Sequence, residues 1–193
     1  MEIFDICDEC GNPTGETVSR EEAHSKGICH RTAHVWIVRK AAGRYQVLLQ
    51  KRSMKKDSFP GQLDTSSAGH IPAGEEPDVS AARELKEELG IAVPPEELSY
   101  AGRFRIRYEK EFHGKLFRDN EIANVYIVER DIPLSDITVQ KEELDSVAWY
   151  DLAETYEKCL ANDPAYCVPM GGLQVLVRRL WADHGDIDHS LRL

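Results

Sequence analysis

Three carboxylates, Glu84, Glu87 and Glu88, fall within five positions of the stretch GHIPAGEEPDVSAARELKEELGI, residues 69–91. If this stretch is helical, the three side chains share one face, because they are three and four positions apart. Like charges so placed repel each other by roughly a few tenths of a kcal/mol per pair. A hard cation such as Mg²⁺, which binds carboxylate and phosphate oxygens, would turn this repulsion into a binding site. A solvated acidic face with Arg83 as an internal partner is the alternative.

The sequence around these carboxylates predicts a loop followed by a helix. Asp78 is an N-cap candidate, and Gly90 stands where a left-handed residue would end the helix. Gly69 and Gly74 flank a loop that can bring main-chain carbonyls and Glu75 close to the carboxylate face. Apolar residues at helical spacing predict one buried stripe: Val79, Ala82, Leu85 and Leu89.

The rest of the chain reads as strands followed by C-terminal helices. Strands are expected at residues 2–7, 33–40, 44–52, 98–115, 121–131 and 144–152. A short helix should begin after Ser19, which can cap it, and end at Gly27. A C-terminal apolar stripe is formed by Leu173, Leu176, Val177, Leu180 and Trp181, and Trp36, Trp149 and Trp181 are expected in the core. This mixture predicts a single α/β (α+β) domain over residues 1–193, with helices at about residues 151–183 packed on the body.

Composition excludes several classes of function. The chain has 24 basic and 34 acidic residues and a formal net charge of −10, so no nucleic-acid polymer is expected as a partner. No apolar run approaches the roughly 20 residues that span a bilayer, so no membrane is expected either. The N-terminus MEIFDICDEC lacks the basic and apolar regions of a signal peptide, which predicts a cytoplasmic protein.

The chain has five cysteines: Cys7, Cys10, Cys29, Cys159 and Cys167. This odd number predicts that free thiols are present. Cys7 and Cys10 have the spacing of a zinc or redox pair, although no second pair follows. His24, Cys29 and His30 could in principle complete a site. A strand end that runs into a turn is the preferred interpretation of this segment.

The glutamate-rich stretch can be written Gly69-x5-Glu75-x7-Arg83-Glu84-Leu85-x-Glu87-Glu88-x-Gly90-Ile91. It resembles the Nudix box, the signature of the Nudix hydrolase superfamily, at every defined position. The resemblance implies an α/β/α sandwich with a mixed sheet, and Mg²⁺- or Mn²⁺-dependent hydrolysis of a small-molecule diphosphate. It also implies that Glu84, Glu87 and Glu88 bind the metal and that one of them is the general base. Gly69 would lend its carbonyl oxygen, and Arg83 would orient the glutamates.

Segments outside the box are similar to one branch of the superfamily, the isopentenyl-diphosphate isomerases, over roughly residues 1–150. The similar segments are EEAHSKGICHRTAHVWI, LLQKRSMKKDSFPGQLDTSSAGHIPAGE and FRDNEIANVY. Five residues stand where the isomerase holds its metal: His24, His30, His70, Asp119 and Glu121. Arg52 and Lys56 stand where it grips the substrate diphosphate, and His70 is a further candidate for contacting substrate. Glu121 is also expected on a strand facing the box helix, as an extra ligand or base.

One position departs from the isomerase pattern. The isomerase has its catalytic cysteine just before the Gly-His pair, where this chain has Ala68. A methyl group cannot move a proton at an allylic carbon, and the box, typically degraded in the isomerase, is intact here. We therefore expect a hydrolase on an isomerase-like frame, with Glu84, Glu88, Arg83 and Glu121 as catalytic candidates. An isomerase and a diphosphate-sensing module are the alternatives. The exact substrate stays open, as does the assembly state, for which a homodimer is one option.

Overall fold

The computed structural model describes residues 2–185 and residue 191; residues 1, 186–190 and 192–193 of the predicted domain lie outside the described part. The strands are β1 (Ile3–Cys7), β2 (Pro13–Ser19), β3 (His30–Ala41), β4 (Arg44–Arg52), β5 (Leu63–Asp64), β6 (Ser67–His70), β7 (Ser99–Phe112), β8 (Lys115–Glu129) and β9 (Leu144–Asp151). The helices are α1 (Arg20–Lys26), α2 (Pro77–Leu89), α3 (Leu152–Leu160) and α4 (Met170–His184), with short 3₁₀ turns η1 (Pro95–Glu97) and η2 (Leu134–Asp136).

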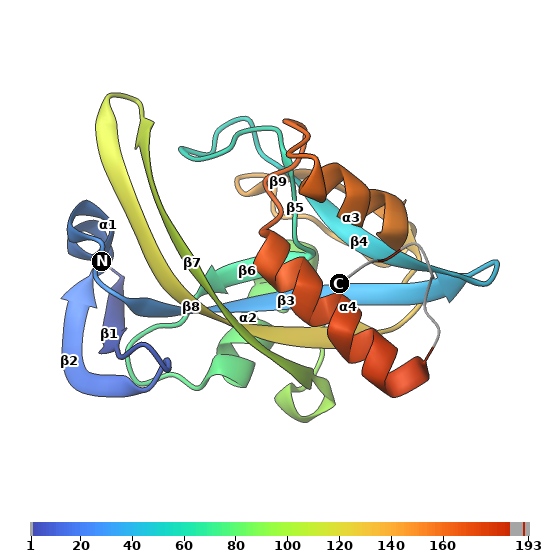
Figure 1. Cartoon of the computed structure of the whole chain (residues 1–193), viewed down its shortest axis with the longest axis horizontal. Helices are drawn as coiled ribbons and strands as arrows, with labels where there is room; N and C mark the ends of the chain where they lie inside the picture. Colours follow the sequence, from blue (N-terminus) through green and yellow to red (C-terminus); the bar gives the residue numbers. More distant parts are fainter. Residues whose placement is uncertain (1, 186–190, 192–193) are drawn as a thin grey trace.

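Seven strands form one mixed sheet, with β3 at its centre (Figure 1). The main path runs β5-β4-β3-β8-β7, while β6 pairs with β3 and β9 pairs with β4. Among the described strands of this sheet, only β3 and β8 pair in parallel. The registers place His30 opposite Glu121 and Thr32 opposite His70, which brings residues distant in the sequence to one end of the sheet.

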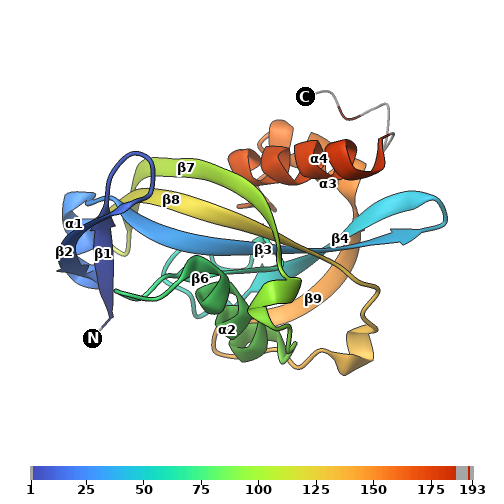
Figure 2. The same ribbon diagram turned by 90° about the horizontal axis from the view of Figure 1, so that it is seen from below.

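Helices cover both faces of the sheet, with α2 on one side and α3 and α4 on the other (Figure 2). Successive strand residues point to opposite faces. Val35 and Ile37 of β3 therefore join the core under α2, whereas Trp36 and Val38 join the core under α3 and α4. The predicted α/β/α arrangement around a mixed sheet is confirmed.

The N-terminal segment forms a separate hairpin of β1 and β2 followed by α1, at one end of the long β7–β8 hairpin (Figure 1). Ser19 caps α1 by accepting a hydrogen bond from the Glu22 amide, and Gly27 ends it with φ +70°, as predicted. Phe4 of β1, with Val18 and Ala23, forms a small apolar cluster that fixes this segment.

The box helix α2 differs from the prediction at its start. Its N-cap is Glu76, with Pro77 at the first turn, and not Asp78, whose carboxylate only accepts a bond from the next amide. Gly90 ends the helix with φ +69°, as predicted. The buried residues of the helix are Ser80, Ala81, Leu85, Glu88 and Leu89. Val79 is exposed, because the helix presents the arc centred on Leu85 to the sheet, so the predicted stripe is wrong at that position.

The two C-terminal helices pack on the α3–α4 face of the sheet. Asp151 caps α3, and α4 begins at Met170, three residues before the predicted stripe. Four residues of that stripe are buried: Leu173, Leu176, Val177 and Leu180. Trp181 is 58% exposed, so its predicted core position is wrong, whereas Trp36 is fully buried as predicted. Among the described residues, no helix is long and apolar enough to cross a membrane.

Candidate active site

Strand β6 and helix α2 bring the box residues together. A β-carbon built at Gly69 would lie 2.2 Å from Glu84 Cδ, so only glycine leaves room for this carboxylate. Two positions earlier, the Ser67 hydroxyl donates a 2.7 Å hydrogen bond to Glu88 Oε2. Alternate strand residues share a face, so Ser67 and Gly69 both point toward α2. The sequence analysis missed Ser67, although the two-residue spacing from Gly69 could have indicated it.

Arg83 lies among the carboxylates of the box. Its Nη1 is 2.8 Å from Glu84 Oε1 and 3.2 Å from Glu87 Oε2, while its Nη2 is 3.3 Å from Glu75 Oε2. The planar guanidinium presents several donors in a fixed fork, so one side chain can orient several carboxylates at once. The sequence predicted contacts of Arg83 with the box glutamates, and the structure has them with Glu84 and Glu87.

Burial sets the protonation of the box glutamates. It raises the pKa of Glu88 to about 8, although the hydrogen bond from Ser67 acts in the opposite direction. It also raises the pKa of Glu84, against the effect of Arg83. Without a cation, burying several carboxylates together favours their protonated forms. A divalent cation bound there would replace that proton, which fits the donor chemistry of a hard-metal site.

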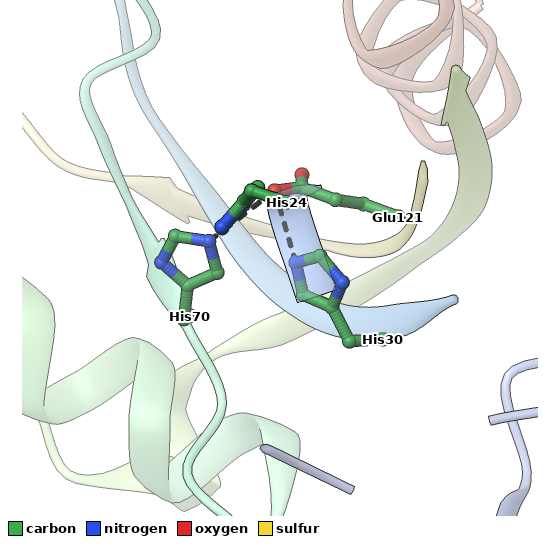
Figure 3. Close-up of side chains that lie close together, drawn as sticks. All are labelled: His24, His30, His70 and Glu121. Atoms are coloured by element: carbon green, nitrogen blue, oxygen red, sulfur yellow. Dashed lines mark ion pairs between the residues drawn. The ribbon is translucent and has the colours of Figure 1, made fainter. Parts of the chain in front are cut away.

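A second cluster lies at the neighbouring end of the sheet, with one ligand atom of each residue within 4.8 Å of every other (Figure 3). Its members are His24 of α1, His30 of β3, His70 of β6 and Glu121 of β8. Glu121 Oε1 is 3.6 Å from His30 Nε2 and 3.5 Å from His70 Nε2. Asp119 is close by, with its Oδ1 3.8 Å from His24 Nε2.

The imidazoles of this cluster are oriented toward a common centre. His24 Nδ1 lies 2.9 Å from the Arg20 carbonyl, and His30 Nδ1 lies 2.9 Å from the Ile28 carbonyl. Because a carbonyl only accepts, Nδ1 carries a hydrogen in both rings, which leaves Nε2 as the nitrogen that a metal ion would bind. The Nε2 atoms of His24, His30 and His70 are buried and have no hydrogen-bond partner among the described residues. Inward nitrogen lone pairs fixed by main-chain carbonyls fit a metal ion.

The charges of the cluster also fit a metal site. Burial lowers the pKa of His24 to about 4, so the ring is neutral at neutral pH and available as a ligand. Burial acts to raise the pKa of Glu121, but His30 and His70 outweigh it and hold that pKa well below its usual range. Burial acts to lower the pKa of His30, but Glu121 outweighs it and raises that pKa. Three imidazole nitrogens and one carboxylate are donors that suit Zn²⁺, Mn²⁺ or another transition metal.

Phe4 supports two of these histidines, which the sequence analysis missed. Its ring stacks on His30 and His70, with centroid distances of 5.0 and 4.6 Å and nearly parallel planes. Nothing in the pattern of β1 indicates this contact, because it depends on how the N-terminal hairpin meets the sheet.

Glu121 differs from its prediction in the direction it faces. It was expected to face the box helix, but it lies on the opposite face of the sheet from α2, because its register partner is His30. Its described partners are His30, His70 and Thr32, and none of them belongs to α2. Glu121 is therefore part of the histidine cluster and not of the carboxylate face.

A cavity of about 330 Å³ has lining residues from both sets. It is lined by Glu2, Ile3, Phe4, His70, Pro72, Ala73, Arg83 and Glu84. It therefore touches a box carboxylate and a histidine of the cluster, together with the N-terminal strand.

The basic loop after β4 already has internal partners. Arg52 pairs with Asp64 at 3.0 Å and donates to the Ser58 carbonyl, while Lys56 pairs with Glu143. The loop is positioned next to the box, since Lys56 and Glu143 both act on the pKa of Glu88. A phosphate contact by Arg52 or Lys56 stays a prediction.

A family model described as the NUDIX domain matches residues 30–170. The chain belongs to the Nudix family. The domain and the similarity to Nudix hydrolases support a hydrolase that acts on pyrophosphate bonds, and Nudix hydrolases generally use divalent cations. The match includes the whole box and most of the histidine cluster, while His24 and Phe4 lie before it.

Curated relatives include both hydrolases and isomerases. The chain is 41% identical over 167 residues to Nudix hydrolase 3 of Arabidopsis thaliana, covering 86% of this chain but only 21% of the plant protein. It is 37% identical to a Nudix hydrolase of Clostridium acetobutylicum, covering 79% of this chain and 71% of the relative. An isopentenyl-diphosphate Δ-isomerase of Roseobacter denitrificans is 28% identical, with 80% and 82% covered. The predicted position in a Nudix branch near the isomerases is therefore confirmed.

Solved structures support the fold. A protein of Deinococcus radiodurans aligns with a TM-score of 0.66 at 16% identity, covering 92% of this chain and 99% of the other. A Caenorhabditis elegans Ap4A hydrolase in a binary complex aligns with a TM-score of 0.54 at 22% identity, covering 79% and 98%. The Nudix domain of Shewanella oneidensis NrtR, solved with ADP-ribose, aligns with a TM-score of 0.53 at 14% identity, covering 86% of this chain and 99% of the other.

Proposed function

We propose that this Nudix protein hydrolyses the diphosphate linkage of a nucleoside diphosphate or a related small organic diphosphate, with Mg²⁺ or Mn²⁺ as cofactor. One observation carries the proposal: Glu84 fits against Gly69 and lines a cavity, while the buried Glu88 accepts a hydrogen bond from Ser67 on the same strand. An arrangement that serves only as a solvated acidic face would not bury Glu88.

The box residues have distinct roles in this proposal. Glu84, Glu87 and Glu88, with the Gly69 carbonyl, would hold the cation, which when bound neutralises phosphate charge and lowers the pKa of a water molecule. Arg83 orients Glu84 and Glu87 through its two short contacts. Glu84 or Glu88 accepts the proton of the attacking water, since both are buried carboxylates with raised pKa values.

The histidine cluster would hold a second metal ion. His24, His30, His70 and Glu121 supply its ligands, and Asp119 stands beside them. Because His70 lines the same cavity as Glu84, this site and the box would act on one substrate. Arg52 and Lys56 would contact the substrate phosphates after exchanging their present carboxylate partners.

Similarity to the isomerases makes isopentenyl-diphosphate isomerisation the second candidate. Ala68 argues against it: this residue pairs with His34 across β6 and β3, next to Gly69 and His70, and its methyl group carries no exchangeable proton. The intact box favours hydrolysis. Hydrolysis needs the full set of box carboxylates, whereas the carbon chemistry of isomerisation does not use them.

A substrate panel tests the proposal. Purified protein with Mg²⁺ or Mn²⁺ would be given nucleoside diphosphates, ADP-ribose, Ap4A, nucleotide sugars and isopentenyl diphosphate. We expect metal-dependent cleavage of at least one diphosphate and no dimethylallyl product from isopentenyl diphosphate. Absence of cleavage across the panel with both metals, or an allylic product without phosphate release, would overturn the proposal.

A further inference from the structure

Two free thiols from distant parts of the chain touch in the N-terminal segment. Cys7 Sγ, at the end of β1, lies 3.5 Å from Cys29 Sγ, just before β3. The Cys7 amide also donates a 3.0 Å hydrogen bond to the Cys29 carbonyl, so the two main chains run side by side at this point. Because the main chains are adjacent and the sulfur atoms are 3.5 Å apart, a small movement would bring the two sulfur atoms to bonding distance.

The CxxC spacing indicated a different partner for Cys7. Cys10 is exposed in the turn after β1, and its amide donates a hydrogen bond to the Asp8 carboxylate, whereas the sulfur that faces Cys7 is that of Cys29. Among the described residues, only the histidine cluster gathers three or more metal-ligand atoms, so the Cys7–Cys29 pair lacks the further ligands of a tetrahedral zinc site. The geometry therefore favours a pair that reacts with itself.

This thiol pair is directly connected to the histidine cluster. Cys29 is the residue before His30, whose Nε2 faces the centre of the cluster. On the other side, β1 carries both Cys7 and Phe4, the ring that stacks on His30 and His70. A register shift between Asp5 and Cys7 lets Phe4 and Cys7 both lie buried, although they are three positions apart.

A disulfide would move the two segments that position the histidines, β1 and the segment before β3. The sulfur atoms must approach from 3.5 Å to about 2.05 Å, and β1 and the segment before β3 would share that movement. Both segments determine where the rings of His30 and His70 stand, and displacement of such supporting contacts weakens metal binding.

We propose that Cys7 and Cys29 form a reversible disulfide on exposure to a peroxide, and that this bond weakens metal binding by the histidine cluster. The disulfide itself is independent of the proposed function, whereas its effect rests on the cluster being a metal site. Oxidative conditions would then lower the metal occupancy of the enzyme without touching a metal ligand.

The chemistry balances with a peroxide as oxidant. The partly exposed Cys29 sulfur attacks one peroxide oxygen, the O–O bond breaks, and a sulfenic acid and one water form. The buried Cys7 sulfur then attacks the Cys29 sulfur, the S–O bond breaks, and the Cys7 proton leaves with the hydroxide as a second water. Two thiols and one molecule of hydrogen peroxide thus give one disulfide and two waters, and a thiol reductant reduces the disulfide again.

Peptide mapping of the full-length protein without reduction tests the disulfide. After treatment with one equivalent of hydrogen peroxide, we expect a Cys7–Cys29 cross-linked peptide that disappears on reduction. Cys10→Ser should give the same peptide, while Cys7→Ser and Cys29→Ser should not. A Cys7–Cys10 bond, or over-oxidation of Cys29 without a cross-link, would overturn the proposal.

A Co²⁺ titration followed by visible absorption tests the effect on the cluster. We expect affinity in the oxidised wild type to fall by about tenfold or more, to recover on reduction, and to be insensitive to peroxide in Cys7→Ser. Equal affinity in both forms, or a sulfur-to-cobalt charge-transfer band in the reduced protein, would contradict it. If Co²⁺ binds neither form, the histidine cluster is no metal site and the proposed control falls with it, while the peptide map still decides the disulfide.

Discussion

Gly69 and Glu84 are in such close contact that a single methyl group cannot be added between them: a β-carbon at Gly69 would stand 2.2 Å from Glu84 Cδ. The contact places the Gly69 main chain beside a candidate metal-binding carboxylate. The reason for a glycine at position 69 is therefore steric: a side chain there would collide with Glu84 in its present position, whatever the backbone conformation.

Gly69→Ala should displace Glu84 and lower kcat/KM by about a hundredfold or more, because misplacement of about 1 Å near a reaction centre has effects of that size. Steady-state kinetics with thermal unfolding would measure it. Gly114→Ala is the control: Gly114 has no neighbour within 4 Å of an added β-carbon, although its φ of +75° makes alanine strained there. Unchanged kinetics in Gly69→Ala would contradict the tight fit of Glu84.

Metal binding at the box should depend on pH through Glu88. Burial raises the pKa of Glu88 to about 8 in the metal-free protein, so a proton must leave before the carboxylate can bind a cation. The apparent Mn²⁺ affinity should therefore rise with pH up to about 8 and then level off, by up to about tenfold per pH unit for one proton displaced.

Calorimetric titration with Mn²⁺ at several pH values would measure this dependence. Glu88→Gln should bind more weakly and lose that part of the pH dependence, while Glu96→Gln, at an exposed position on η1, should behave as wild type. The same pH profile in Glu88→Gln and wild type would show that another group controls the site.

The histidine cluster should bind a transition metal independently of the box. His30→Gln should lower Co²⁺ affinity by at least about tenfold, because it removes a buried nitrogen whose orientation the Ile28 carbonyl fixes. His113→Asn is the matched control, since His113 is exposed at the tip of the β7–β8 hairpin with φ +50°, which asparagine tolerates. Equal Co²⁺ binding in wild type and His30→Gln would remove the cluster from the account.

The isomerase frame makes a specific prediction at Ala68. Wild-type protein should give no dimethylallyl diphosphate from isopentenyl diphosphate, because no thiol stands at this point of β6. Product analysis with and without Mg²⁺ would test it, and Ala68→Cys is the variant in which weak isomerase activity could emerge. Allylic product from the wild type would show that another group performs the proton transfer.

Helix ends could be predicted from the sequence because their signals are local, whereas contacts between distant segments could not. Ser19, Gly27 and Gly90 mark helix ends through their own hydrogen bonds and backbone conformations, so they could be identified from a few neighbouring residues. The start of α2 was wrong by two residues, because Pro77 sets the first turn and leaves Asp78 inside the helix.

Most residues of the candidate site were foreseen, apart from Ser67 and Phe4, but their arrangement was not. The box motif identified the glutamates, yet the direction of Glu121 depends on the parallel register of β3 and β8, which no local pattern encodes. The contacts of Phe4 with His30 and of Cys7 with Cys29 arise where the N-terminal hairpin meets the sheet, across more than 20 positions of the chain. Such contacts follow from topology, and residue type alone does not indicate them.

Hydrolysis in ¹⁸O-labelled water, with wild type and Glu88→Gln compared on the best substrate of the panel, tests the central claim most directly. We predict that wild type with Mg²⁺ or Mn²⁺ places one labelled oxygen in a phosphate product. We also predict that Glu88→Gln, while still folded, slows this incorporation by about 10²- to 10⁴-fold. Incorporation at the wild-type rate in Glu88→Gln, or cleavage that needs no divalent cation, would contradict a hydrolase built on the box carboxylates.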